Sequence, residues 1–118
     1  MLAVGCSPAT KIAATAWKVS PDGEWLTRVA RYDSAGPGIN ALYEEVELKR
    51  RSTDKGVALL TLDEGSVLPD DLKGPPVITL QWRDPSHLEI AYRAGEIDHQ
   101  IVKVADVSVE TRRAAVQR

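Results

Sequence analysis

The sequence has no phenylalanine, a single cysteine, only two histidines and no long hydrophobic run. A single cysteine cannot form an internal disulfide, and no apolar stretch approaches the roughly 20 residues that a helix needs to cross a bilayer. The formal net charge is -2, from 15 basic and 17 acidic residues, whereas nucleic-acid-binding domains are usually strongly basic. These absences exclude a disulfide scaffold and a membrane-spanning helix, and we expect no nucleic-acid partner.

What is present is enough for one folded domain. The chain of 118 residues has 43% hydrophobic and 27% charged residues, a balance typical of globular rather than disordered proteins. A domain of this size buries roughly two-thirds of the surface of its unfolded chain. Because phenylalanine is missing, aliphatic residues, tryptophans and tyrosines must fill the core. We expect Trp82, at the end of an apolar run, to be buried and Trp25, beside a turn, to be more exposed.

Two hairpins are predicted from their turns. In the first turn Pro21 fixes φ at the first corner, Asp22 hydrogen-bonds its own backbone, and Gly23 adopts the left-handed conformation that closes the bend. The arms of this hairpin lie within Thr15–Arg31. A second turn at Arg83–Ser86 separates predicted strands at 77–82 and 88–93, and the latter alternates with Leu88, Ile90 and Tyr92 inward.

Residues 41–51 fit two patterns. Leu42, Val46 and Leu48 alternate with polar residues as in a half-buried strand, whereas Leu42, Tyr43 and Val46 also fit a helical stripe after a possible cap at Asn40. Only a strand accounts for Leu48, so a strand is favoured. Further strands are expected at 56–63, 97–104 and 105–110, and glycines and prolines predict loops at Ser34–Asn40 and Glu64–Pro76.

The pattern as a whole predicts about seven short strands and no helix. The fold class is therefore all-β, a single antiparallel β-sandwich or partly open barrel. We assign residues 1–14 to a truncated signal and tether, 15–110 to the β domain, and 111–118 to a tail that is either a helical turn or frayed.

The first seven residues, Met-Leu-Ala-Val-Gly-Cys-Ser, place Cys6 after small and apolar residues. This layout resembles the site at which bacterial lipoproteins receive diacylglycerol. With the Ser-Pro-Asp-Gly hairpin and the stretch from Val77 through Trp82 to Tyr92, the chain resembles small bacterial envelope lipoproteins of unknown function. The resemblance implies lipidation at Cys6 and, since Ser7 is not acidic, an outer-membrane location facing the periplasm. The alternative is a cytosolic domain with Cys6 as a free thiol.

Few residues suit chemistry. His87 and His99 have no metal-ligand spacing around them and are predicted to lie on the surface, so neither a metal nor a cofactor is expected. No serine-nucleophile motif and no phosphate-binding glycine loop is present. The prediction is a protein that is not an enzyme. The alternative is a small hydrolase that gathers Asp22, Asp84 and His87 where the two proline turns meet.

The functional prediction is a binding or interaction domain of the envelope, with an unknown protein or cell-wall partner and contact with the membrane only through its lipid. Strand edges and the loops Ser34–Asn40 and Glu64–Pro76 are the expected docking elements. A sharper alternative is an inhibitor or immunity protein that blocks an envelope-acting enzyme. The cluster Lys49-Arg50-Arg51 is either a solvated strand end or a contact for anionic lipid or an acidic partner.

Overall fold

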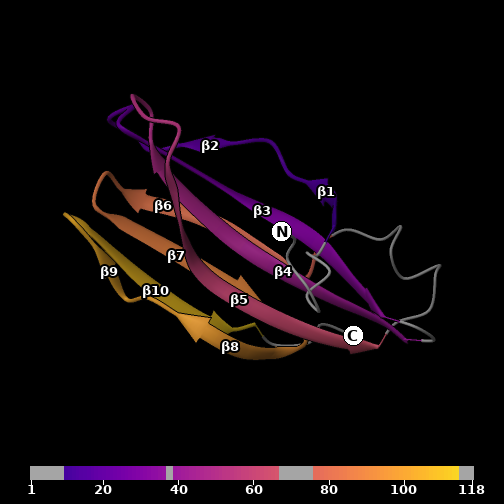
Figure 1. Ribbon diagram of the computed structural model, residues 1–118. Helices are drawn as coiled ribbons and strands as arrows, with labels where there is room; N and C mark the ends of the chain where they lie inside the picture. Colours follow the sequence, from indigo (N-terminus) through magenta and orange to yellow (C-terminus); the bar gives the residue numbers. More distant parts are fainter. Residues whose placement is uncertain (1–9, 37–38, 67–75, 115–118) are drawn as a thin grey trace.

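A computed structural model of the chain describes residues 10–36, 39–66 and 76–114, which form ten strands and no helix (Figure 1). The prediction of an all-β fold is confirmed. The strands are β1 Thr10–Ala14, β2 Lys18–Val19, β3 Trp25–Gly36, β4 Ile39–Arg50, β5 Gly56–Ser66, β6 Ile78–Asp84, β7 His87–Tyr92, β8 Glu96–Gln100, β9 Lys103–Val104 and β10 Val107–Arg113.

The strands form two sheets that face each other (Figure 1). The first has the order β1-β3-β4-β5-β8, with β2 following β1 along the same edge of β3. The second has the order β6-β7-β10-β9. The chain passes from the first sheet to the second between β8 and β9, where the Ile101 amide donates to Leu59 O at 2.8 Å and the Val109 amide donates to Val102 O at 2.9 Å. The architecture is an open sandwich joined along one side.

The core lies between the sheets and is aliphatic, with one tryptophan. Along β4 the inward residues Leu42, Val46 and Leu48 are buried, which confirms that residues 41–51 favour a strand. Leucines from β5 and alternate residues of β7 and β10 complete the cluster. Burial of each such aliphatic side chain contributes on the order of 1.5–3 kcal/mol.

A buried carboxylate links the two sheets. Glu44 of β4 is fully buried and accepts hydrogen bonds from the amides of Val77 at 3.0 Å and Ile78 at 3.2 Å, at the start of β6. Its other partner is Arg31 on β3, with Nε 3.1 Å from Oε2. Glu44 therefore ties the beginning of β6, in the second sheet, to the middle of β4, in the first sheet.

Lys18 of β2 makes a second link on the same side of the sandwich. Its Nζ donates to the carbonyl of Leu80 at 3.0 Å, and its own carbonyl accepts from Trp82 Nε1 at 3.3 Å. Trp82 is partly buried and packs against the core, whereas Trp25 is 7% exposed and lies within it. The prediction that Trp25 is the more exposed of the two was wrong, because Trp25 opens β3 on its inward face.

Both predicted hairpins are confirmed. In the β2–β3 turn the Gly23 amide donates to Ser20 O at 2.9 Å, and Gly23 has a φ of 78°. The carboxylate of Asp22 accepts from the hydroxyl of Ser20 at 2.6 Å and from the Glu24 amide at 3.1 Å. Asp22 therefore hydrogen-bonds the turn backbone, and Gly23 is in the left-handed conformation.

The structure corrects several boundaries. Thr10–Ala14, within the predicted tether, is β1, so the described domain begins at Thr10 and not at Thr15. Most of the predicted loop Ser34–Asn40 lies in β3 and β4, and Glu64–Ser66 extends β5. Residues 37–38 and 67–75 lie outside the described residues. Pairing with a long neighbouring strand keeps these glycine- and alanine-rich stretches extended.

The strand count and pairing also differ from the prediction, which was about seven strands in an antiparallel arrangement. The expected strand at 97–104 is divided into β8 and β9 by the passage between sheets, and Ala105 is a turn residue with a φ of 50°. Thr111–Arg113 of the predicted tail belong to β10, which pairs with β7 in parallel. The parallel pair arises because the chain leaves β7, visits the first sheet as β8, and returns.

Candidate functional site

Four turns gather at one end of the sandwich (Figure 1). We call this end, formed by the β2–β3, β4–β5, β6–β7 and β9–β10 turns, the turn end. The first described residue, Thr10, pairs with Asp33, near the far end of β3. A strand of 12 residues such as β3 spans about 40 Å at roughly 3.3 Å per residue. The chain therefore enters the domain at the end opposite the turn end.

Trp17 stands over the outer face of the first sheet, close to the turn end. Its ring lies 4.3 Å from Cζ of Arg28 and 4.8 Å from Nζ of Lys49, which are outward side chains of β3 and β4. Cations at these distances are attracted to the indole ring. Trp17 borders a groove of about 280 Å³ whose other walls include Glu45, Glu47, Asp54 and Val57. We call it the Trp17 groove.

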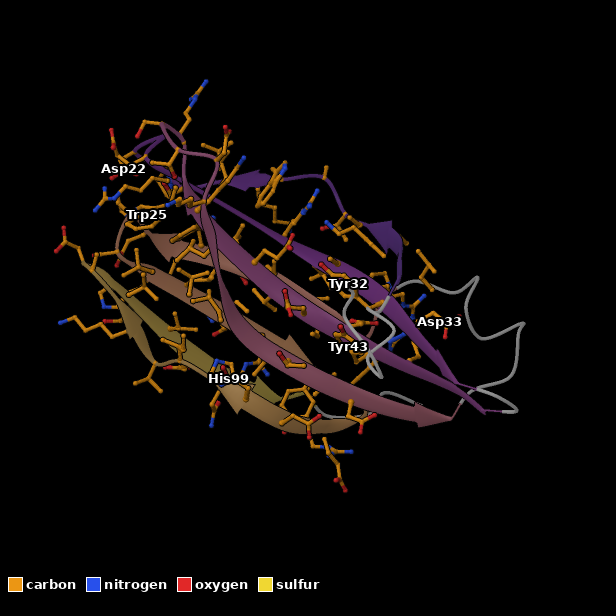
Figure 2. The ribbon with its side chains drawn as sticks, viewed as in Figure 1. Asp22, Trp25, Tyr32, Asp33, Tyr43 and His99 are labelled. Atoms are coloured by element: carbon orange, nitrogen blue, oxygen red, sulfur yellow. The ribbon has the colours of Figure 1, made fainter. Side chains whose placement is uncertain are left out.

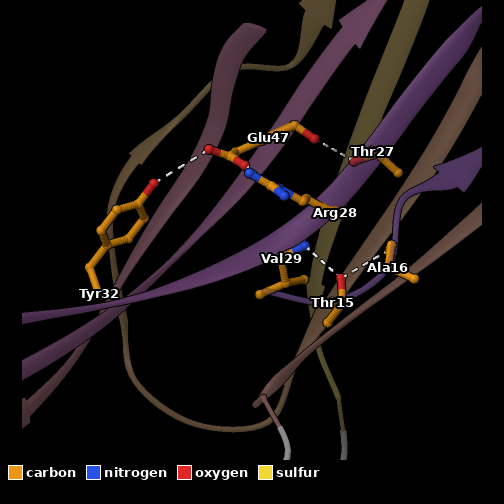
Figure 3. A network of polar contacts seen from close by, with 7 residues as sticks. All are labelled: Thr15, Ala16, Thr27, Arg28, Val29, Tyr32 and Glu47. Carbon is orange, nitrogen blue, oxygen red and sulfur yellow. Dashed lines mark hydrogen bonds and ion pairs between the residues drawn. The ribbon is translucent and has the colours of Figure 1, made fainter. Parts of the chain in front are cut away.

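The segment that carries Trp17 is fastened to β3 by the polar contacts in Figure 3. The hydroxyl of Thr15 accepts from the Val29 amide at 3.0 Å and donates to the carbonyl of Ala16 at 3.3 Å. On the neighbouring strand Glu47 binds Nε of Arg28 at 2.6 Å, so the cation beneath Trp17 is itself held in place. The indole and its supports are a fixed platform rather than a loose side chain.

Tyr32 and Tyr43 lie on the same outer face of the first sheet, farther from the turn end than Trp17 (Figure 2). Their rings are stacked with centroids 5.1 Å apart, and the hydroxyl of Tyr32 donates to Glu47 at 3.4 Å. Burial and the charge of Glu47 raise the pKa of Tyr32 to about 12. Burial, followed by the charge of Glu47, also raises the pKa of Glu45 above its ordinary value. Two neighbouring carboxylates thus line the groove side of this face.

The β4–β5 turn carries four cations, Lys49, Arg50, Arg51 and Lys55, and one acid, Asp54. Within the described residues none of the four cations pairs with a carboxylate. Arg50 lies over the ring of Trp25, with Cζ 4.4 Å from the centroid. Together with Lys49 over Trp17, this arrangement orders two of the cations on aromatic faces.

A second concavity, of about 550 Å³, lies on the outer face of the second sheet. Glu89 forms its floor and is only 7% exposed, because Arg83 at 2.6 Å and Arg112 at 3.5 Å cover it. The prediction that Glu89 points away from the core is compatible with its burial, since the arginines and not the core enclose it. Hydrogen bonding to Arg83, together with the charges of both arginines, lowers the pKa of Glu89.

The rim of this concavity holds two of the three residues of the hydrolase alternative. Asp84 lies 2.7 Å from Nδ1 of His87, and this hydrogen bond, followed by the one from the Ser86 amide, lowers the pKa of Asp84. Asp22 makes its hydrogen bonds within its own turn. Ser108 lies beside His87 in register, but no hydrogen bond joins its hydroxyl to His87 in the described part of the chain. The structure brings Asp84 and His87 together without joining them to a nucleophile.

The remaining candidate residues lie apart. His99 is exposed on β8, opposite Thr61, and His87 is exposed as well, as predicted for both (Figure 2). Cys6 and Ser7 lie outside the described residues. In the part of the chain that the structure describes, no three metal-ligating side chains come together, and no helix is long and apolar enough to cross a membrane.

The free strand edges differ in how far they are occupied. Glu44 and Lys18 already form hydrogen bonds with backbone groups at β6, so these groups are not available to another strand. The strand β8 presents charged and polar residues, which discourage pairing with another strand. The β1 edge is short and interrupted by a register shift between Lys11 and Ala13. The described edges at β1, β6 and β8 therefore offer few backbone groups or few uncharged residues to a partner strand.

Sequence reasoning missed the Trp17 groove. Its parts come from the β1–β2 connection, β3, β4, the β4–β5 turn and β5, and Arg28 faces Glu47 only in the register of the β3–β4 hairpin. The available signal was the pair of long alternating stretches flanking residues 37–38, which fixes that register once they are read as one hairpin. No protein-family model matches the chain, and neither a curated protein nor a solved structure matches it.

Proposed function

We propose that this protein is a non-enzymatic binding module of the bacterial cell envelope, anchored through a lipid on Cys6 to the outer membrane and facing the periplasm. Its docking surface is the turn end together with the Trp17 groove, and its partner is a protein or cell-wall component. The resemblance around Cys6 supports the location. The observation that carries the docking surface is the fixing of Trp17 over a groove by two cations, Arg28 and Lys49.

A fixed indole beside charged groups suits recognition. Tryptophan and arginine are enriched among the residues that dominate binding energy at interfaces, because they offer a large apolar area and directed hydrogen bonds. Trp17 is already held by its neighbours, so its ordering adds little entropy cost when a partner binds. The carboxylates of Glu45 and Asp54 on the groove wall supply acceptors beside the apolar ring.

The position of the proposed lipid anchor on Cys6 also favours the turn end as the docking surface. The four residues that follow Cys6 reach at most about 14 Å when extended, so a lipid on Cys6 holds Thr10 and the adjoining end of β3 near the membrane. Because Thr10 pairs with Asp33, the turn end at Trp25 lies about 26 Å along β3 from the point where the tether enters, at the usual strand rise. The described parts of the loops first predicted to dock, residues 34–36, 39–40 and 64–66, lie at the ends of β3, β4 and β5 opposite the turn end, so we place docking at the turn end instead.

Site-specific photo-crosslinking tests the proposal in the full chain expressed from its native locus. A photoreactive phenylalanine replaces Val57, a groove residue that is 40% exposed, or Val102, an equally apolar residue at the β8–β9 bend that is 68% exposed. We expect a discrete cross-linked product from position 57, absent from position 102 and lost when Trp17→Ala is added. For a cell-wall partner, sedimentation with purified sacculi replaces the cross-link as the readout.

The proposal is wrong if position 57 gives no product and the chain does not sediment with sacculi. It is also wrong if Trp17→Ala leaves both signals unchanged. Urea unfolding of the Trp17→Ala variant is the folding control, because loss of binding counts only in a chain that unfolds at its usual urea concentration.

A further inference from the structure

Among the described residues, no carboxylate forms an ion pair with the cations around the β4–β5 turn. We call residues Lys49–Lys55 the basic turn. Four of its seven residues are cations and one, Asp54, is an acid. The adjacent β2–β3 turn adds Asp22 and Glu24, but the carboxylate of Asp22 is engaged by the Ser20 hydroxyl and the Glu24 amide. An arginine-rich corner without carboxylate partners is thus displayed beside the Trp17 groove.

Two features order these cations before any partner arrives. Cation–π contacts hold Nζ of Lys49 4.8 Å from the centroid of Trp17 and Cζ of Arg50 4.4 Å from the centroid of Trp25. The backbone of the turn is tied to its neighbour, since the Arg51 amide donates to Glu24 O at 2.9 Å. A guanidinium held by its flat face on an indole keeps its N–H edges free, and those edges match a carboxylate through two parallel hydrogen bonds.

We infer that the basic turn receives an acidic segment of a protein partner, whose carboxylates pair with Arg50 and Arg51 while an adjacent apolar side chain covers Trp17. This inference rests on the proposed function, whose partner it specifies. An acidic segment meets cations that form no ion pair within the described part of the chain, and these opposite charges steer the encounter and fix its register.

The surroundings of the basic turn favour a protein over a phosphate polymer or a lipid surface. The groove beside it contains Glu45, Glu47 and Asp54, which repel a polymer carrying one negative charge in every unit. A protein segment can present carboxylates to Arg50 and Arg51 and uncharged residues to the groove. The tether also enters the domain away from the basic turn, because Thr10 pairs with Asp33 and Arg50 pairs with Trp25, about 26 Å apart along β3.

The test uses the photo-crosslink at position 57 with two variants of equal charge change. Arg50→Gln/Arg51→Gln removes two of the four cations of the basic turn, the two that are proposed to bind the carboxylates. Lys103→Gln/Arg113→Gln is the matched control, since Lys103 and Arg113 are exposed and Arg113 also lies over an aromatic ring, that of Tyr92. We expect the cross-linked product to fall at least fivefold in the first variant and to stay within twofold of wild type in the second.

Mass spectrometry of the cross-linked product adds a second readout, and the partner peptide attached to position 57 should be net acidic. An unchanged yield with Arg50→Gln/Arg51→Gln, or a neutral or basic attached peptide, overturns the inference and leaves the proposed function standing. Purified chain that binds long-chain polyphosphate or phosphatidylglycerol vesicles at 150 mM salt, and loses this binding in the same variant, also overturns it. Absence of any product in wild type also overturns the inference, and it removes the proposed function as well only if the chain does not sediment with sacculi.

Discussion

Truncation of Glu44 to alanine tests how the two sheets are held together. The carboxylate is fully buried, accepts the amides of Val77 and Ile78, and lies 3.1 Å from Nε of Arg31. In Glu44→Ala the guanidinium and two backbone amides lose this acceptor in a place that water does not reach. Removing one member of a buried ion pair typically costs about 3–5 kcal/mol. The total stability of a domain is only about 5–15 kcal/mol.

We therefore expect Glu44→Ala to lower the free energy of unfolding by about 4 kcal/mol, measured by urea unfolding with tryptophan fluorescence. The matched control is Glu47→Ala on the same strand, whose pair with Arg28 is partly open to solvent, with side chains 19% and 22% exposed. Exposed pairs contribute about 0.2–1 kcal/mol. A loss below about 1 kcal/mol for Glu44→Ala, or an equal loss for both variants, refutes the role given to Glu44.

A double-mutant cycle between Glu44 and Arg31 measures the interaction between these two side chains. Adding Arg31→Met to Glu44→Ala should cost less than the sum of the two single changes, because each single change already breaks the same ion pair. Strict additivity of the three measured free energies contradicts a direct interaction between Arg31 and Glu44.

Two further predictions concern backbone and charge. Gly95 has a φ of 92°, and a Cβ there would lie 2.9 Å from Asp63 O, whereas at Gly23, with a φ of 78°, the nearest atom is 3.7 Å away and belongs to a flexible arginine. Gly95→Ala should therefore cost at least about 2 kcal/mol and Gly23→Ala about 1 kcal/mol in urea unfolding, and the reverse order contradicts the geometry. The arginines over Glu89 lower its pKa below the ordinary 4.5, so its ionised form stabilises the fold above that pH and this contribution is lost as the pH falls through the lowered value. The difference in Tm between wild type and Glu89→Gln should shrink on acidification below pH 4.5, and a difference that is constant from pH 7 to the acid limit of folding excludes this contribution.

Local features of the fold could be predicted from the sequence because their causes lie within a few residues. The Ser20–Gly23 turn closes through its own side chain and its own left-handed glycine. The strand at residues 41–51 follows from the position of Leu48, which no helical stripe accommodates. Alternation with period two decides such elements before any partner strand is known.

What escaped prediction depends on partners far along the chain. The burial of Glu44 requires the amides of residues 77 and 78, and its sequence position next to Glu45 gives no sign of it. The tryptophans were assigned in the wrong order because Trp25 faces inward only in the register of β3, while Trp17 is held outside by Arg28 and Lys49. The parallel pairing of β10 with β7 likewise follows from a route through both sheets.

The central claim is that this domain is held at the cell envelope by a lipid on Cys6, with the turn end free to meet a partner. Intact mass spectrometry of the protein expressed from its native locus, with the membrane fraction measured separately, tests it most directly. The account predicts a membrane-bound species that begins at Cys6 and carries acyl chains. A soluble species that keeps Met1 and an unmodified thiol contradicts it.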